Sequence, residues 1–450
     1  MIAADQRQWW LLGAMSGVLG LIVLDETVVS VSLPSITREL DLSVSASHWV
    51  VNAYLLGFTC SVAIAGRLGD LFRRKSYFTA GAALFGFASL LAALAPNGTV
   101  LIGARGVQGI AAAMIFPTSL ALITTAFPPN KRGVAFGYQT TVGGVFMASG
   151  PLLGGMLTQV LSWRMIFWVN IPVVLAITVL LWLIWSSDYD IEHPRTSAKQ
   201  SGMDLLGPVF LVLCLFGLVA YVMQGPSWGW MSPASLVLMI MGITTVFLFL
   251  RRELKYPAPL FDLSLLKIPS FGGGAVIFAI FQLEKIAVFV FAAQFIQNHL
   301  GLTPVVSGAV VSLAVLPTLR TSVFVGKATD RLGSEITLVR GATIHGTAIV
   351  LLAAATMVQN FWLMLVPLVI WGASMPSIAI PVRRQQMNVV PADKHAQAGG
   401  INLTIQFIGG CLGLAACSAL VAETQSYPLL FLAVGLLTIL VAPIASRTMK

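Results

Sequence analysis

The chain has 450 residues, of which 57% are hydrophobic and only 10% are charged. A soluble domain carries roughly 25% charged residues, so this composition excludes a water-soluble globular protein. The net charge of +9 comes from short basic clusters at the ends of long apolar runs, a pattern that favours membrane orientation over nucleic-acid binding.

A membrane-spanning helix needs about 20 apolar residues. On that basis the sequence predicts fourteen spanning helices, and their even number places both termini on the same side of the membrane. The expected spans are residues 9–33, 48–66, 75–95, 99–124, 133–158, 165–186, 204–224, 233–251, 271–298, 305–327, 334–357, 361–382, 395–421 and 427–446.

The basic residues indicate which side that is. Of the 26 Lys and Arg residues, only Arg38 and Arg164 fall on the side opposite to the termini, while Arg105, Lys285 and Arg320 lie inside spans. Since cytoplasmic loops carry an excess of Lys and Arg, both termini are expected in the cytoplasm. The expected location is the inner (plasma) membrane, with lipid as the surrounding partner.

Two polar connections divide the chain into six helices, an inserted pair and six more helices. The predicted units are an N-terminal bundle (1–186), a cytoplasmic linker (187–203), an inserted helix pair (204–251), a second linker (252–270) and a C-terminal bundle (271–450). The fold class is therefore all-α, with two pseudo-symmetric bundles. Such internal repeats are typical of transporters that bind substrate between the repeats near mid-membrane.

Four motifs follow one another along the chain. The first helix contains Asp25-Glu26-Thr27-Val28-Val29 and ends near Leu33-Pro34, and the loop after the second helix runs from Gly66 to Lys75. The fourth helix contains Arg105-x-x-Gln108-Gly109, and the fifth contains Gly150-Pro151-x-x-Gly154-Gly155. The loop after the tenth helix, with Gly326, Asp330 and Arg331, echoes the loop after the second.

These motifs, over nearly the whole length, resemble the major facilitator superfamily and, within it, the fourteen-span drug:proton antiporters. The chain departs from the family pattern at Arg73, where glycine is usual, and at Ser30 and Ser32. The resemblance implies a bundle of six helices on each side of a central site. It also implies export driven by the proton gradient, with no further cofactor.

The resemblance assigns the two loops to a cytoplasmic latch, whose ion pairs would form in one state and break in the other. Plain orientation charge is the alternative interpretation. The glycines and proline of the fifth helix would form a hinge or a tight seal, although ordinary close packing of glycine explains them equally well. The latch comprises Gly66, Asp70, Arg74, Lys75, Asp330 and Arg331, and the hinge comprises Gly150, Pro151, Gly154 and Gly155.

Ionisable residues inside spans are expensive, so they are functional candidates. Asp25 and Glu284 are the expected proton-coupling carboxyls, and the resemblance implies a role in proton coupling for Arg105. The substrate-binding candidates are Asp25, Glu26, Gln108, Glu284 and Arg320. Snorkelling to the headgroups is the alternative for Arg105, and an ion pair with Lys285 or Arg320 is the alternative for Glu284.

His345 is expected to be a packed neutral histidine rather than a ligand or relay. The four cysteines, all inside apolar runs, are expected to be packing residues. No motif for nucleotide binding, metallopeptidase or acyl-transfer chemistry accompanies the helices, which argues against an enzyme.

The sequence thus predicts a monomeric secondary transporter that exchanges amphipathic small molecules for protons, with no nucleic-acid partner. Export of an endogenous metabolite, such as a siderophore or lipid, is the alternative. A transport-inactive membrane sensor is the remote one.

Overall fold

The computed structural model describes residues 4–128, 131–185, 204, 206–256, 261–391 and 394–449. The secondary structure of these residues is helical throughout, and 14 helices or paired helices are long and apolar enough to cross a membrane. This confirms the predicted fold class and number of spans. Several helices continue past the apolar segments, as α1 does from Ala4 to Glu39, because helices extend into the polar membrane surface.

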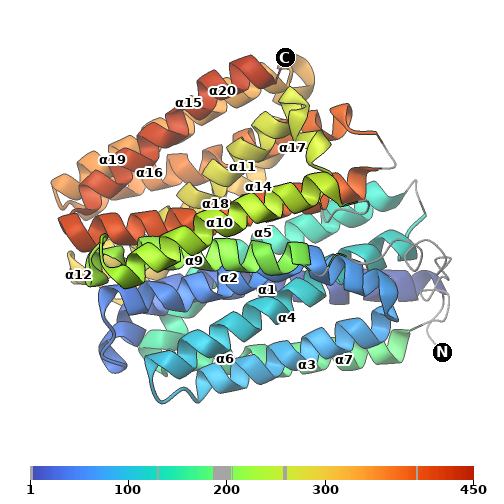
Figure 1. The fold of residues 1–450 in the computed structure, drawn as a ribbon, viewed down its shortest axis with the longest axis horizontal. Helices are drawn as coiled ribbons and strands as arrows, with labels where there is room; N and C mark the ends of the chain where they lie inside the picture. The colour runs from blue at the N-terminus through green and yellow to red at the C-terminus, as the bar shows by residue number, and fades with distance from the viewer. Residues whose placement is uncertain are drawn as a thin grey trace.

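The first six spans form one bundle, which we call the N-terminal half (Figure 1). Asn97 caps the fourth span by accepting a hydrogen bond from the Val100 N–H at 3.0 Å, which satisfies a donor that would otherwise be unpaired. The elements are α1 (Ala4–Glu39), α2 (Val44–Leu71), α3 (Arg74–Ala93), α4 (Gly98–Ala126), α5 (Arg132–Val160), and α6 (Met165–Trp168) followed by α7 (Asn170–Ile184).

The last six spans form the C-terminal half, in which several spans are broken. Pro317 and Pro376 begin the second segments of two spans, since proline lacks the N–H that would continue the helix. The elements are η3 (Leu263–Lys267), α11 (Pro269–Ala287), the π-helical η4 (Val288–Ala292), α12 (Ala293–Asn298), α13 (Pro304–Val315), α14 (Pro317–Leu332), α15 (Ser334–Met357), α16 (Phe361–Ser374), α17 (Pro376–Val389), α18 (His395–Thr424), α19 (Tyr427–Ile439) and α20 (Val441–Thr448).

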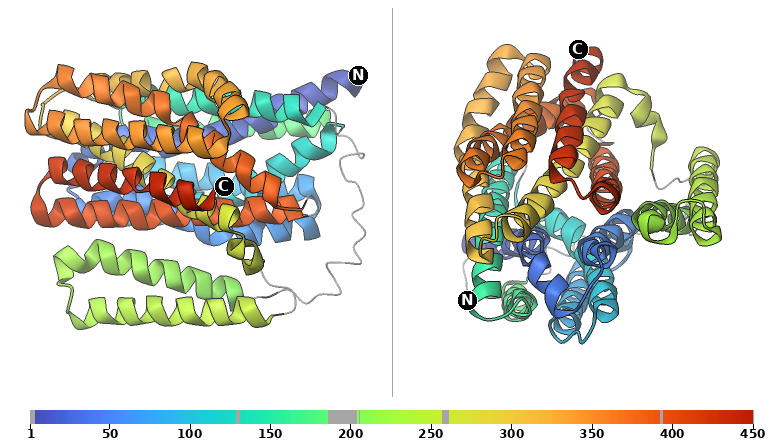
Figure 2. Two further views of the ribbon diagram at one scale, coloured as in Figure 1. Left: turned by 90° about the horizontal axis from the view of Figure 1, so that it is seen from above. Right: turned by 90° about the vertical axis from the view of Figure 1, so that its left-hand side faces the viewer.

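The inserted pair, α9 (Leu206–Trp228) and α10 (Pro233–Lys255), lies beside the two halves (Figure 2). Only α9 faces them closely, packing against α2 and α18. Ser45 on α2 donates to the Met223 carbonyl at 3.0 Å, and Asn52 donates to the Cys411 carbonyl of α18 at 3.2 Å. The pair therefore covers one side of the seam between the halves.

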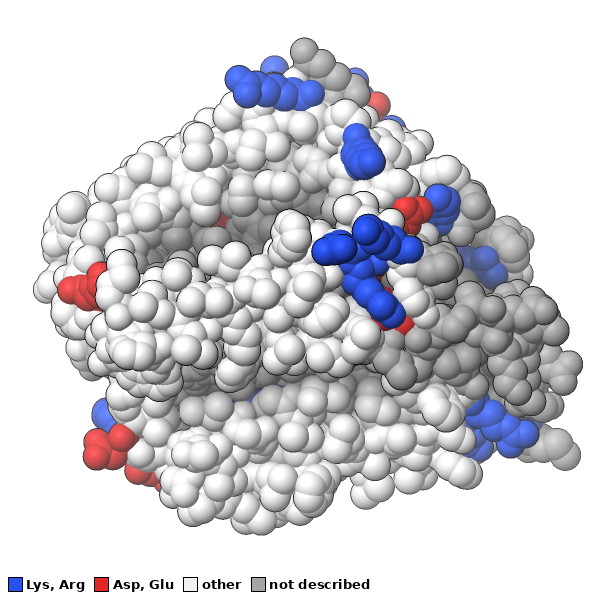
Figure 3. All heavy atoms as spheres, in the orientation of Figure 1, with Lys and Arg blue, Asp and Glu red and all other residues white. Residues whose placement is uncertain are grey.

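Charge is divided between the two ends of the molecule. The start of α1 and the end of α20 lie toward the right in Figure 1. We call this end of the molecule the termini end and the opposite end the far end. On the face drawn in Figure 3, most Lys and Arg side chains lie toward the termini end. There Lys394 donates to Asp262 at 2.8 Å and holds the pKa of that carboxyl below its usual value.

Candidate functional site

The glycine motif of α5 determines how the halves meet at the far end. A Cβ at Gly150 would lie 2.0 Å from Oγ1 of Thr27 on α1, and one at Gly155 would lie 2.2 Å from the Pro304 carbonyl oxygen of α13. Gly308 on α13 lies equally close to the Pro151 carbonyl oxygen. Since side chains longer than hydrogen would collide there, Gly150 permits close packing of α5 on α1, while Gly155 and Gly308 permit backbone contact across the two halves.

Toward the termini end, α5 and the second half of the facing span separate. Val134 and Tyr138 on α5 are exposed, as is Phe324 on α14. Hydrogen bonds between the halves gather instead at mid-membrane and the far end, where Leu152 N–H donates to Ser312 at 2.9 Å and Gln297 donates to the Val31 carbonyl at 2.8 Å. The structure thus represents a state that is sealed at the far end.

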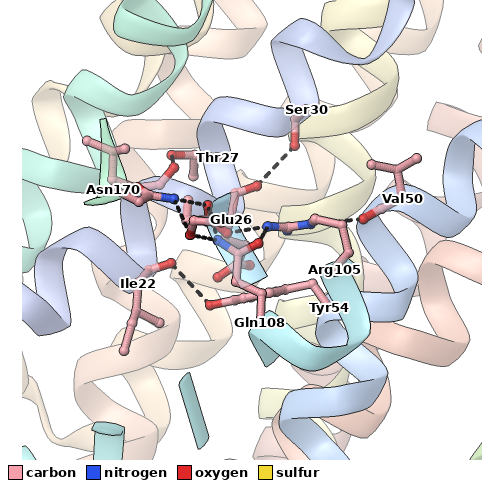
Figure 4. Close-up of polar contacts among 12 residues, drawn as sticks. Ile22, Glu26, Thr27, Ser30, Val50, Tyr54, Arg105, Gln108 and Asn170 are labelled. Carbon is pink, nitrogen blue, oxygen red and sulfur yellow. Dashed lines mark hydrogen bonds and ion pairs between the residues drawn. The ribbon is translucent and has the colours of Figure 1, made fainter. Parts of the chain in front are cut away.

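Asp25 on α1 is fully buried, and its partners Arg105, Gln108 and Asn170 lie close together in Figure 4. Nη1 of Arg105 donates to its Oδ2, forming an ion pair. Gln108 and Asn170 both donate to its Oδ1, at 3.1 and 3.0 Å. Ser89 on α3 accepts from Gln108 at 3.0 Å and so joins the network. Four helices therefore converge on one carboxylate.

The guanidinium of Arg105 is held in place by the protein rather than by the membrane surface. Its Nε donates to the Val50 carbonyl at 3.1 Å, and its Cζ lies 4.3 Å from the centre of the Tyr54 ring. Arg105 is fully buried, so the snorkelling alternative is wrong. Two buried polar atoms, Nη2 of Arg105 and Oδ1 of Asn170, have no hydrogen-bond partner among the described residues.

Glu26, the next residue along α1, faces the other half of the molecule. Nζ of Lys285 on α11 lies 3.4 Å from its Oε1, and Gln282 donates to the same oxygen at 3.2 Å. Gln406 on α18 donates to Gln282 at 3.0 Å and extends the network. A small cavity beside Glu26 is lined by Thr27, Ser30, Val51, Ile286 and Phe289.

Glu284 lies in a third cluster, inside the C-terminal half. Its Oε1 lies 2.9 Å from Nε2 of His345 on α15, and its Oε2 accepts from the Trp371 indole at 2.7 Å. The alternative of a pair with Lys285 or Arg320 is wrong. Adjacent residues of a helix point about 100° apart, which sends Lys285 to Glu26 and Glu284 into its own half.

Arg320 joins none of these clusters. Its side chain is exposed on α14, next to Leu319, which approaches Gly144 of α5. It therefore lies away from the buried carboxylates, and its binding role stays a prediction.

The latch residues have contacts within their own halves. Asp330 pairs with Arg384 at 2.8 Å, Arg74 donates to Thr125 at 2.6 Å, and Nζ of Lys75 lies 3.8 Å from the centre of the Trp182 ring. Gly66 has open space at its Cβ position, and Arg331 is exposed. The side chain of Asp70 lies outside the described residues, so the cross-bundle latch stays a prediction.

Several polar residues of the network give little signal in the sequence. Asn170 appears only as part of the junction after the fifth span, and Ser89 is one small polar residue among many. His48 contacts Ser418 at 2.5 Å and Gln294 at 3.0 Å, across the far-end seam. Only their position opposite a partner distinguishes such residues, and position requires the fold.

Comparison with known proteins gives consistent results. The sequence profile described as Major Facilitator Superfamily matches residues 15–287 and 275–449. The multidrug resistance protein Stp of Mycobacterium tuberculosis (strain CDC 1551 / Oshkosh) is 30% identical over 91% of this chain and 75% of its own. The tetracenomycin C resistance and export protein of Streptomyces glaucescens is 29% identical over 93% and 76%.

A similar fold is found among solved structures. A crystal structure of a D-xylose–proton symporter aligns with a TM-score of 0.70, covering 98% of this chain and 97% of that one, at 14% sequence identity. At that identity the similarity shows the fold alone.

Proposed function

The chain belongs to the major facilitator superfamily, and from that premise we propose that it exports amphipathic small molecules in exchange for protons. The observation that carries the proposal is the fully buried ion pair of Asp25 and Arg105. A buried ion pair stabilises a fold only weakly, because desolvation offsets the attraction between the charges. Its presence in the centre of a transporter supports a role in coupling.

Proton binding at Asp25 would change the contacts of Arg105. The carboxylate accepts hydrogen bonds from Arg105, Gln108 and Asn170, and a proton on it would neutralise the only acidic partner of that guanidinium among the described residues. Arg105 would then be a buried cation without a counter-ion, which is strongly unfavourable. A proton therefore favours any other state in which Arg105 gains water or a new partner.

The alternation would use the two ends of the molecule. Basic residues gather at the termini end, which the charge rule assigns to the cytoplasm, so the sealed far end would face outward. Rocking of the halves would break the Glu26–Lys285 pair and the α5–α13 contact, opening the central site to the outside. A proton from outside would bind as substrate leaves.

The chemistry of the central site bears on the substrate. The names of two relatives refer to drug resistance, which supports export of drug-like compounds. Glu26 and Lys285 place an acid and a base side by side where the halves meet. This arrangement suits a ligand with both charges or several polar groups, so an endogenous polar metabolite is the second candidate.

Replacement of the central carboxyl tests the proposal. In inverted membrane vesicles with an imposed pH gradient, Asp25→Asn should abolish proton-driven uptake of ethidium, used as an amphipathic probe. The matched control is Asp41→Asn at an exposed position with φ 49°, a conformation that asparagine tolerates. The control should transport at the wild-type rate. Wild-type uptake by a correctly folded Asp25→Asn protein would refute the assignment.

A further inference from the structure

The two halves carry buried carboxyls on corresponding helices, but with different partners. Asp25 lies on the first span of the N-terminal half, and Glu284 lies on the first span of the C-terminal half. The guanidinium of Arg105, the partner of Asp25, only donates hydrogen bonds. The imidazole of His345, the partner of Glu284, has two nitrogens, each of which can donate or accept. The C-terminal cluster is therefore the one in which acid and partner can share a proton.

The hydrogen bonds around His345 determine where its hydrogen lies. Oγ of Ser374 is 2.7 Å from the Ile370 carbonyl oxygen and 2.9 Å from the Trp371 carbonyl oxygen. Because a carbonyl oxygen only accepts, the single serine hydrogen points to these oxygens. Nδ1 of His345, 2.7 Å from the same Oγ, must then donate to it.

The other ring nitrogen faces the carboxyl. Nε2 of His345 lies 2.9 Å from Oε1 of Glu284, and the indole of Trp371 already donates to Oε2. With Nδ1 protonated, a neutral ring has only a lone pair on Nε2. Two lone pairs would repel at 2.9 Å, so one hydrogen must lie between the two atoms, either on the carboxyl or on the ring.

We propose that Glu284 and His345 form a second proton-binding site, which holds one shared proton in the state described. Glu284 and His345 are both fully buried, and Phe281 and Trp371 flank the imidazole with ring centres 6.1 Å away, so a proton suits this site. The proposal deepens proton-coupled export by adding a site to that of Asp25.

The surroundings of Glu284 and His345 determine the cost of losing the shared proton. Lys285, beside Glu284 on α11, faces Glu26, and among the described residues no ion pair joins Glu284 or His345 to a further side chain of α11 or of the helices packed against it. Loss of the proton would leave a buried carboxylate against a lone pair, with only the Trp371 indole donating. Such a state is costly, so proton loss favours a rearrangement of these helices.

The helix that carries Glu284 also makes the far-end seam. The span continues from α11 through the π-helical η4 into α12. Gln294 and Gln297 on α12 bond to His48 and to the Val31 carbonyl of the N-terminal half. A shift of α11 on proton loss would therefore change these hydrogen bonds, which lie where the halves are sealed. π-Helical turns are frequent at functional sites.

Infrared spectroscopy of the full-length protein in liposomes tests the proposal without a transport substrate. We expect the acid-minus-alkaline difference spectrum to contain a signal of Glu284, either a protonated-carboxyl band or a shifted carboxylate band, that Glu284→Gln removes and that the control Glu335→Gln, at the start of α15, retains. An unchanged spectrum in a folded Glu284→Gln protein would overturn the proposal.

His345→Gln tests the sharing of the proton and serves even if Glu284→Gln does not fold. A glutamine amide cannot take up a proton from the carboxyl, so the midpoint of the Glu284 band should differ from that of the wild type. A midpoint equal to that of the wild type would contradict a shared proton. If the shared proton is refuted, ethidium exchange through Asp25 is unaffected. If ethidium exchange through Asp25 fails, the infrared titration of Glu284 is unaffected, so the two outcomes are distinguishable.

Discussion

At the scale of single residues, neighbouring side chains of α1 contact different halves of the molecule. Asp25 turns into its own half and meets Arg105, whereas Glu26 crosses to Lys285 in the other half. The rotation of about 100° per residue in a helix makes this division possible. One residue thus places its charge inside its own half, while the next one contacts the opposite half.

The cross-half pair predicts a double-mutant result. Glu26→Lys or Lys285→Glu alone should lower the melting temperature of the purified protein, because each places like charges together in a partly buried site. The double variant with both exchanges restores an ion pair and should recover most of the lost melting temperature. The pair is expected to contribute about 1 kcal/mol to the free energy of unfolding. Melting of the double variant below both single variants would exclude this pair.

The positions of the buried ionisable residues were predictable from the sequence, but their partners were not. A charge inside a span stands out in any membrane sequence, which identified Asp25, Arg105 and Glu284. Their partners come from helices far away in the chain: Asn170 lies 145 residues from Asp25, and Trp371 lies 87 residues from Glu284. An asparagine or tryptophan in a span has many ordinary roles, so only the fold reveals the network.

At the scale of helices, the glycines of α5 permit a contact that any larger residue would prevent. Gly150 packs on α1 in its own half, while Gly155 packs on α13 in the other. The sequence predicted either a hinge or a seal from this motif. The contacts show close backbone packing at the far end, and a hinge role stays a prediction.

Gly155→Ala should weaken the far-end seal. Its Cβ would lie 2.2 Å from the Pro304 carbonyl oxygen, and overpacking of this kind costs about 1–3 kcal/mol. A cysteine introduced at the buried position Ser307 of α13 should then react faster with an impermeant maleimide added outside. Gly143→Ala is the control, since its Cβ would meet only Gln139 at 3.9 Å. Equal labelling rates in both variants would show that the contact does not govern closure.

Hydropathy predicted the helices well and the breaks within them poorly. Lipid forces each span to satisfy its own backbone hydrogen bonds, so long apolar runs indicate spans directly. The apolar sequence gives no separate signal for the π-helical segment Val288–Ala292. That segment begins at Val288, three residues after Lys285, and so lies close to the site in the chain.

At the scale of the whole molecule, the seam between the halves contains both sealed and open parts. Contacts of α5 with α13 close the far end, and α9 covers the side between α2 and α18 (Figure 2). Toward the termini end α5 and α14 separate, and Tyr138 and Phe324 are exposed there. The proposed cycle moves this opening from one end to the other, with proton occupancy of the buried acids favouring each state in turn.

Coupled flux is the property from which the rest of the account follows. In proteoliposomes without an imposed pH gradient, an ethidium gradient should drive protons in the opposite direction, which a pH-sensitive dye trapped in the lumen would report. Wild-type protein and Asp41→Asn should show this proton movement, and Asp25→Asn should not. Ethidium flux through the wild-type protein with no change in lumenal pH would contradict proton exchange.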